Sequence, residues 1–226
     1  MMKNYVIMLS GLIWIWTAAC TKMDYHYRDF LPMANRIYVG KVDSVKVHPG
    51  KNRIKFSWKK SPDPTVTHVT AYWNNKRDSL TIPISDDAID TAELIVPNLD
   101  EETYVFELFA SDAVGNRSVP VEVVGKVYGA QYESLLLNRL PRSAQVQGDS
   151  LVVAWFEAGG DGLLGTTISY RNQAGANQSI TLHPDSIRSV LYGVDYAEDI
   201  SYHSTYFPDT LAVDTFYSRI DWIVLN

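Results

Sequence analysis

The stretch Arg53-Ile54-Lys55-Phe56-Ser57-Trp58 alternates polar and apolar residues along six positions. A strand has a side-chain period of two, so Ile54, Phe56 and Trp58 fall on one face of an extended chain. The same pattern returns in Leu151-Val152-Val153-Ala154-Trp155, where the second tryptophan follows the first at an offset of 97 residues. This repetition predicts two related β domains in tandem.

The chain around the first stretch alternates in the same way from residue 41 to residue 123, with Gly, Pro, Asn and Asp at the turns. Seven short strands separated by turn signals are typical of an antiparallel sandwich. Ile168 and Ile200 continue the repeat, because they follow Ala71 and Tyr104 at offsets of 97 and 96 residues. We therefore expect an all-β fold with one sandwich over residues 41–129 and a diverged copy over 130–226.

The first of these regions resembles a fibronectin type III domain. The resemblance rests on Trp58 followed by prolines, on Leu99 leading into Tyr104, and on the run from Ala110 to Ser118. It implies that Tyr104 is a corner tyrosine whose hydroxyl bonds back to the main chain, and that Ile200 lacks this bond in the second copy. Because Trp73 aligns with an inward residue of that copy, Tyr72 is predicted to point outward.

The N-terminal segment indicates secretion. A cationic Lys3 precedes an apolar run from Tyr5 to Trp16, which is shorter than the roughly 20 residues that span a bilayer. The small residues before Cys20 resemble the lipobox of bacterial lipoproteins. Residues 1–19 are thus predicted to be a lipoprotein signal peptide, with Cys20 as the lipidation site that anchors the chain in the membrane. The alternative is an ordinary secretory signal followed by a free cysteine.

Residues 20–40 show no clear period and are predicted to be a lipidated tether. Four further segments resemble those of an uncharacterised family of Gram-negative envelope lipoproteins with two fibronectin-like repeats. These segments are Pro49 to Ile54, Asn116 to Pro120, Tyr128-Gly129 with Leu136 to Arg139, and Asp214 to Ser218. The resemblance implies a cell-envelope location, in the outer membrane with a periplasmic or surface-exposed body, and an association with surface glycan-uptake systems.

Charge and motif searches argue against several functions. The net charge is −6, and no block of Lys and Arg is present, so nucleic acid is not an expected partner. The five histidines lack zinc-site spacing, and adjacent Glu101 and Glu102 are read as a solvated corner. The loop with Asp86, Asp87 and Asp90 leaves calcium binding open, because it lacks the pattern of an EF-hand. No catalytic residue, cofactor or metal is predicted.

Aromatic side chains remain as candidates for ligand contact, since flat rings stack well on sugar faces. Most of the 14 Tyr, 6 Trp and 7 Phe are expected to fill the two cores. Tyr72, Tyr206 and Phe207 are predicted to be ligand contacts. The sequence thus predicts a non-catalytic envelope lipoprotein whose sandwiches bind a glycan or a partner protein. The alternative is a passive spacer or scaffold in the outer membrane.

Overall fold

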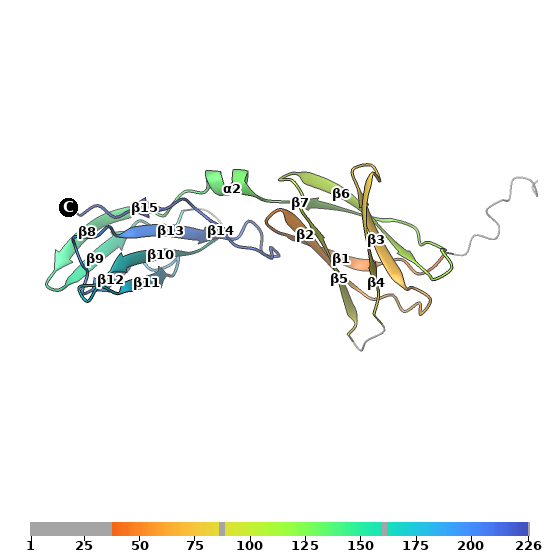
Figure 1. The fold of residues 1–226 in the computed structure, drawn as a ribbon, viewed down its shortest axis with the longest axis horizontal. Coiled ribbons are helices and arrows are strands. Elements are labelled where there is room, and N and C mark those ends of the chain that lie inside the picture. The colour runs from red at the N-terminus through yellow and green to blue at the C-terminus, as the bar shows by residue number, and fades with distance from the viewer. Residues whose placement is uncertain (1–37, 86–88, 160–161, 226) are drawn as a thin grey trace, which may run out of the picture. The chain divides into compact units, whose positions relative to one another are not determined.

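The computed structural model describes residues 38–85, 89–159 and 162–225. Within them almost all of the regular secondary structure is antiparallel strand, gathered into two sandwiches (Figure 1). The prediction of an all-β fold with two tandem fibronectin type III-like sandwiches is confirmed. Cys20 and the rest of residues 1–37 lie outside the described residues, as do Asp86 and Asp87.

The first sandwich contains a three-stranded and a four-stranded sheet. The three-stranded sheet has the order β1-β2-β5, formed by β1 (Asp43–Pro49), β2 (Arg53–Lys59) and β5 (Thr91–Pro97). The four-stranded sheet has the order β4-β3-β6-β7, formed by β3 (His68–Trp73), β4 (Asp78–Pro83), β6 (Thr103–Ser111) and β7 (Val121–Lys126).

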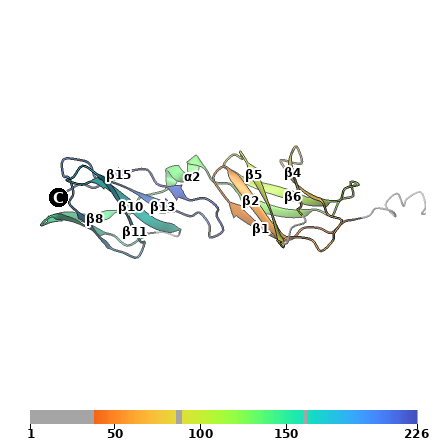
Figure 2. The same cartoon turned by 60° about the horizontal axis from the view of Figure 1, so that its bottom comes forward.

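The second sandwich repeats this strand order, with one short strand more in its larger sheet. Figure 2 shows its strands β8, β10, β11, β13 and β15. Its smaller sheet has the order β12-β9-β8, formed by β8 (Pro141–Gln147), β9 (Ser150–Trp155) and β12 (Arg188–Tyr192). Its larger sheet has the order β11-β10-β13-β14, formed by β10 (Leu163–Arg171), β11 (Asn177–Leu182), β13 (Ser201–Tyr206) and β14 (Phe216–Tyr217). The short β15 (Asp221–Trp222) pairs with β13 as well. The internal repeat read from the sequence therefore describes two copies of one topology.

The alternating residues form the two cores as their period requires. Ile54 and Phe56 are fully buried in the first core, and Trp58 is 3% exposed. Trp155 is also 3% exposed in the second core, where its indole Nε1 donates to Ser189 Oγ at 3.0 Å. Burial of one such side chain stabilises the fold by about 1.5–3 kcal/mol. The first core also includes Val39, which is 6% exposed and precedes the first strand.

The corner of the first sandwich has the predicted bond. The Tyr104 hydroxyl donates to the main-chain oxygen of Asp100 at 3.3 Å, and burial raises the pKa of this phenol. In the second sandwich Ile200 occupies the matching position and is 4% exposed. Its side chain is held by apolar packing, because an alkyl group forms no hydrogen bond, while its main-chain oxygen accepts the Ile223 N–H at 2.8 Å.

A short helix, α2 (Ala130–Leu135), connects the two sandwiches. Its first turn is capped from a distance, because the Glu101 carboxylate accepts the main-chain N–H groups of Gln131 and Tyr132, each at 2.7 Å. Free N–H groups at a helix start favour such an acceptor. Glu101 was predicted to be part of a solvated corner. It instead fixes the connecting segment, and this partner lies 30 residues away in the sequence.

Candidate functional site

Tyr206, one of the predicted ligand contacts, is buried rather than exposed. Its side chain is 8% exposed, and its hydroxyl donates to the main-chain oxygen of Leu137 at 2.6 Å. Every second residue of β13 is buried, and Tyr206 follows Tyr202 and Ser204 at this spacing. Tyr206 therefore belongs to the inward row of this strand, so little of its ring is open to a ligand, and its role as a ligand contact stays a prediction.

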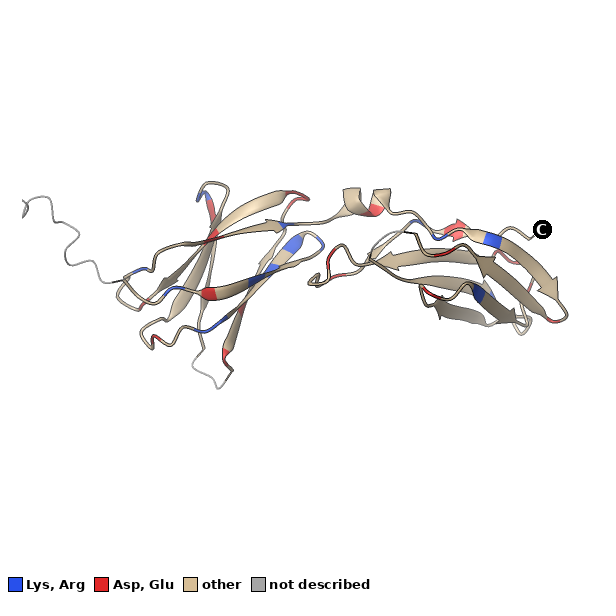
Figure 3. Cartoon of the chain, turned by 180° about the vertical axis from the view of Figure 1, so that it is seen from behind, with Lys and Arg blue, Asp and Glu red and all other residues tan. Residues whose placement is uncertain are grey.

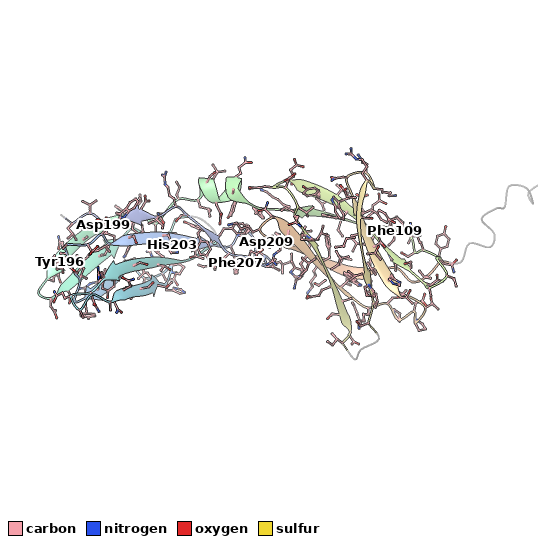
Figure 4. The ribbon with its side chains drawn as sticks, viewed as in Figure 1. Phe109, Tyr196, Asp199, His203, Phe207 and Asp209 are labelled. Carbon is pink, nitrogen blue, oxygen red and sulfur yellow. The ribbon has the colours of Figure 1, made fainter. Side chains whose placement is uncertain are left out.

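Phe207 is half-buried, and its main chain is fixed to the loop before β10. The Phe207 N–H donates to the Gly162 oxygen at 2.8 Å. Gly162 has φ +86°, and a Cβ there would lie 2.2 Å from the Phe207 oxygen, so only glycine fits. Figure 4 shows Phe207 in the loop that follows β13. Its role as a ligand contact stays a prediction.

Tyr72 points to the outer face of the first sandwich, as the alignment predicted, since Ala71 and Trp73 pack against the core. Its ring is edge-on to Phe109 at a centroid distance of 5.7 Å. The guanidinium of Arg117 lies 5.9 Å from the same ring. Tyr72 is therefore half-buried, with Phe109 and Arg117 against its ring, although it also lines a groove of about 240 Å³. Its role as a ligand contact stays a prediction.

A more open pair of rings lies on the outer face of the second sandwich. Trp222 is 57% exposed and Tyr217 is 48% exposed. Trp222 pairs with Ser201, and Tyr217 pairs with Thr205. Directly paired residues of antiparallel strands point to the same side of a sheet. Because β13 buries its alternate residues, both rings share the outward face with Ser201 and Thr205.

The spacing of this ring pair follows from the register. Ser201 and Thr205 are four residues apart on β13, which is about 13 Å at about 3.3 Å per residue. His203 lies between them on the same face, and its ring is edge-on to Tyr217 at 5.6 Å. Figure 4 shows His203 in the middle of β13. The two exposed rings and His203 thus form one row, which we call the aromatic row.

Hydroxyl side chains cover the sheet beside the aromatic row. Thr167 pairs with His203 on one side and with Thr181 on the other, and the two threonine hydroxyls are 3.2 Å apart. Ser169 pairs with both Ser201 and Ser179. Serine and threonine hydroxyls both donate and accept hydrogen bonds. This surface therefore offers polar contacts in both directions.

A polar groove of about 490 Å³ continues this surface, since it is lined by Ser169, Ser179 and Ser201 of the hydroxyl rows. Arg171 and Glu198 lie in its wall, with Nη1 and Oε1 separated by 3.2 Å. Asp199 and Asn177 complete its charged and amide groups. The groove begins next to Trp222, because Ser201 lines the groove and pairs with that residue.

The edge that carries the two rings is held by Asn138. The strand is interrupted between β14 and β15, and Asn138 Nδ2 donates to the Arg219 oxygen at 2.7 Å and to an Asp221 carboxylate oxygen at 2.9 Å. The Ser218 hydroxyl donates to Asn138 Oδ1 at 2.5 Å. One amide side chain thereby fixes the interruption from both sides, and with it the spacing of Tyr217 and Trp222.

The neighbouring Arg139 supports the interior of the second sandwich. It is 4% exposed, and its Nε donates to the Phe156 oxygen at 2.8 Å, while its main-chain N–H donates to Ser204 Oγ at 3.0 Å. Burial lowers the pKa of this guanidinium, which nevertheless stays charged because its ordinary value is so high. Arg139 is structural, whereas Asn138 acts on the exposed edge.

A serine and a histidine of the first sandwich are in hydrogen-bonding contact, and this pairing also occurs in hydrolases. Ser57 Oγ lies 2.7 Å from His48 Nε2. His48 Nδ1 lies 3.1 Å from the main-chain oxygen of Leu211, where a catalytic triad has a carboxylate. A carbonyl oxygen only accepts, so Nδ1 carries a proton and, in neutral His48, the Ser57 hydroxyl donates to Nε2. This pair holds the loop between β13 and β14, because His48 contacts Leu211 of that loop.

Charged side chains of both signs are distributed over the described ranges. Figure 3 shows Lys and Arg interspersed with Asp and Glu over both sandwiches. Within those ranges, no cluster of three His, Cys, Asp or Glu side chains has the arrangement of a metal site. No helix in the described part of the chain is long and apolar enough to cross a bilayer.

Sequence reasoning missed Trp222 and Tyr217. Each lies in a strand of two residues, and such a strand shows no alternation from which an outward position could be read. The available signal was indirect. Phe216 and Tyr217 are adjacent, so a strand must turn one of them outward.

Comparison with known proteins gives the following findings. No curated protein matches the chain. One similar solved structure is that of the chicken CNTN1 FN1-FN3 domains, with a TM-score of 0.40 and 12% identity over 81% of this chain and 66% of that chain. Another is the segment of two fibronectin type III domains from chicken tenascin, with a TM-score of 0.33 and 14% identity over 82% of this chain and 99% of that chain.

A family described as a domain of unknown function, DUF4998, matches residues 20–216. This range includes both sandwiches up to β14. Since the match extends over more than half of the sequence, the chain belongs to the DUF4998 family.

Proposed function

We propose that this protein is a non-catalytic envelope lipoprotein that binds a neutral glycan chain on the outer face of its second sandwich. The observation that carries the proposal is the aromatic row, in which Trp222 and Tyr217 are 57% and 48% exposed on one face beside His203. Tryptophan and tyrosine side chains exposed to this extent lose apolar hydration when a sugar ring stacks on them.

The chemistry of the surrounding sheet supports a sugar ligand. Each sugar ring has apolar faces bounded by hydroxyl groups, and this sheet presents rings bounded by serine and threonine hydroxyls. The β13 residues paired with the two rings are about 13 Å apart at about 3.3 Å per residue, farther than one sugar ring reaches. The ligand is therefore an oligosaccharide or polysaccharide chain, with its continuation along the polar groove.

The charge of the protein favours a neutral glycan over an acidic one. The net charge is −6, and Glu198 and Asp199 line the groove. Arg171 is paired with Glu198, so its charge is compensated before any ligand binds. An acidic polysaccharide would meet this surface with a net repulsion.

Anchoring through Cys20 is the second part of the proposal, and it rests on the sequence alone. A diacylated cysteine gives firm attachment, since each buried CH₂ group contributes about 0.8 kcal/mol. Labelling of cells with an alkyne fatty acid is expected to mark the wild-type protein and not the Cys20→Ala variant. Equal labelling of both would contradict anchoring at this residue.

Glycan binding is tested with the purified chain on an array of neutral and acidic polysaccharides, followed by calorimetry with cellohexaose, mannohexaose and xylohexaose. At least one neutral chain is expected to bind, with little response to acidic glycans. Binding of no glycan, together with capture of a single envelope protein from intact cells by cross-linking, would replace the proposal with a protein-binding function. Failure of both would leave the spacer function.

A further inference from the structure

The aromatic row is connected to the first sandwich through the loop between β13 and β14. Asp214 of this loop accepts two hydrogen bonds from Arg53, one from Nε at 2.8 Å and one from Nη2 at 2.5 Å. It also accepts the main-chain N–H of Lys51 at 2.8 Å. These contacts lower the pKa of Asp214, with the Arg53 hydrogen bond as the largest cause. A carboxylate with three donors from another sandwich is strongly oriented.

Main-chain contacts bring the same loop against the turn after β1. The Val213 N–H donates to the Pro49 oxygen at 2.8 Å, and His48 donates through Nδ1 to the Leu211 oxygen. Gly50 lets this loop approach closely, because a Cβ there would lie 2.6 Å from Asp214 Oδ2 and 2.9 Å from Val213 Cγ2 and would displace these side chains. The first sandwich is therefore shaped to receive this loop.

Phe216 extends the connection to the helix between the sandwiches. It is fully buried, and its ring is edge-on to Tyr132 at 5.2 Å and to Tyr128 at 5.8 Å. Tyr132 is held in turn, because Glu101 of the first sandwich accepts its main-chain N–H. Aromatic pairs of this geometry contribute about 0.5–1.5 kcal/mol beyond the area they bury.

Phe216 and Tyr217 are the two residues of β14, so anchoring one orients the other. Phe216 points inward to the tyrosine pair, and Tyr217 points outward to His203. A strand of two residues has few main-chain bonds of its own. The Thr215 hydroxyl donates to the Tyr217 hydroxyl oxygen at 3.1 Å, and Thr215 lies between the held residues Asp214 and Phe216. The direction of the Tyr217 ring therefore depends on the contacts that hold residues 214–216.

We infer that Arg53 is a positioning residue for the glycan site, acting from the first sandwich through Asp214 and Phe216 on Tyr217. This inference rests on the proposed glycan-binding function. It assigns the first sandwich a part in binding at a site on the second.

The test uses the full chain with Arg53→Gln and Asp214→Asn, singly and together. Lys55→Gln is the matched control, because Lys55 lies on the same strand and its ion pair with Glu93 stays within the first sandwich. The measurements are the Kd for the neutral hexasaccharide that binds best and the amide hydrogen exchange of residues 213–217.

Each single variant is expected to exchange faster at residues 213–217 and to bind about tenfold more weakly, which corresponds to about 1.4 kcal/mol. The double variant is expected to match the single ones, since residues that act as one unit are not additive. Lys55→Gln is expected to leave both measurements unchanged. Unchanged exchange in Arg53→Gln would overturn the coupling, and faster exchange with unchanged affinity would overturn the positioning role. If the wild-type chain binds no hexasaccharide, the glycan function fails, while exchange still decides whether the loop is held.

Discussion

The two sandwiches share one strand order but differ in what lies over their outer faces. In the first, Tyr72 is enclosed by Phe109 and Arg117, and Lys76 lies 5.4 Å from the Phe109 ring. In the second, Tyr217 and Trp222 are about half exposed. The shared fold therefore does not determine whether a sandwich binds a ligand. The side chains around the outward rings decide which face is open to one.

The last strand of each larger sheet shows the origin of this difference. In the first sandwich β7 pairs with β6 without interruption, from Leu108 with Val121 to Thr103 with Lys126. In the second sandwich the corresponding strand is divided into β14 and β15, with two paired residues in each. The divided strand obtains its order from side chains such as Asn138 and Phe216. The exposed rings are thus on the edge that depends most on side-chain contacts.

The largest effect is expected when the support of the divided edge is removed. Phe216→Ala should destabilise the protein by about 3–5 kcal/mol, the range for loss of a buried phenylalanine. Val123→Ala on the uninterrupted β7 should cost less, because that side chain is only half-buried and its strand keeps its main-chain bonds. Urea unfolding measures both. Equal losses would show that the two edges are held alike.

Asn138→Ala removes the side chain that bridges the interruption between β14 and β15. The free energy of unfolding should fall by about 2 kcal/mol, because three hydrogen bonds lose their partner. Amide exchange at residues 216–223 should rise in this variant. Gln147→Ala on exposed β8 is the control and should change neither quantity. A loss of stability without faster exchange at this edge would argue against the role of Asn138.

The contact of Asp214 with the first sandwich should depend on pH. Its pKa is lowered in the folded state, so its stabilising contribution is present above the unfolded value of about 3.9 and is lost as the pH falls through the lower folded value. At neutral pH, Asp214→Asn should destabilise by about 1.5 kcal/mol, typical of hydrogen bonds to a charged group. The difference between variant and wild type should shrink in acid. A pH-independent difference would contradict the assignment.

The smallest effect concerns the corners. Tyr104→Phe should cost about 1 kcal/mol, because the bond to the Asp100 oxygen is lost while the ring keeps its packing. Ile200→Leu at the matching position should also cost less than about 1.5 kcal/mol, as a volume-conserving change. Urea unfolding at neutral pH compares them. A much larger loss for Tyr104→Phe would mean that the corner bond determines the fold of the first sandwich.

Much of the fold could be read from the sequence, because strands with a period of two bury their alternate residues. Trp58, Trp155 and Tyr104 all lie where the pattern and the resemblance place them. The candidate site was harder to predict. Tyr206 is predicted to contact a ligand, although continuation of the period from Tyr202 places it inside.

The rest depends on contacts between residues far apart in the chain. Glu101 caps a helix 30 residues later, and Arg53 meets Asp214 at a separation of 161 residues. Local patterns carry no information on such pairs. Three segments that support the resemblance to envelope lipoproteins, at Pro49 to Ile54, Leu136 to Arg139 and Asp214 to Ser218, nevertheless meet at the divided edge or at the loop before it.

The most direct test of the glycan site on the second sandwich is calorimetric titration. The neutral hexasaccharide that binds best is titrated into the wild type, Trp222→Ala and Tyr72→Ala. Loss of an anchoring tryptophan should cost about 2 kcal/mol, so Trp222→Ala is expected to weaken binding at least tenfold. Tyr72→Ala, on the covered face, is expected to leave the Kd unchanged. Binding that survives Trp222→Ala and is lost in Tyr72→Ala would contradict the assignment of the glycan site to the second sandwich.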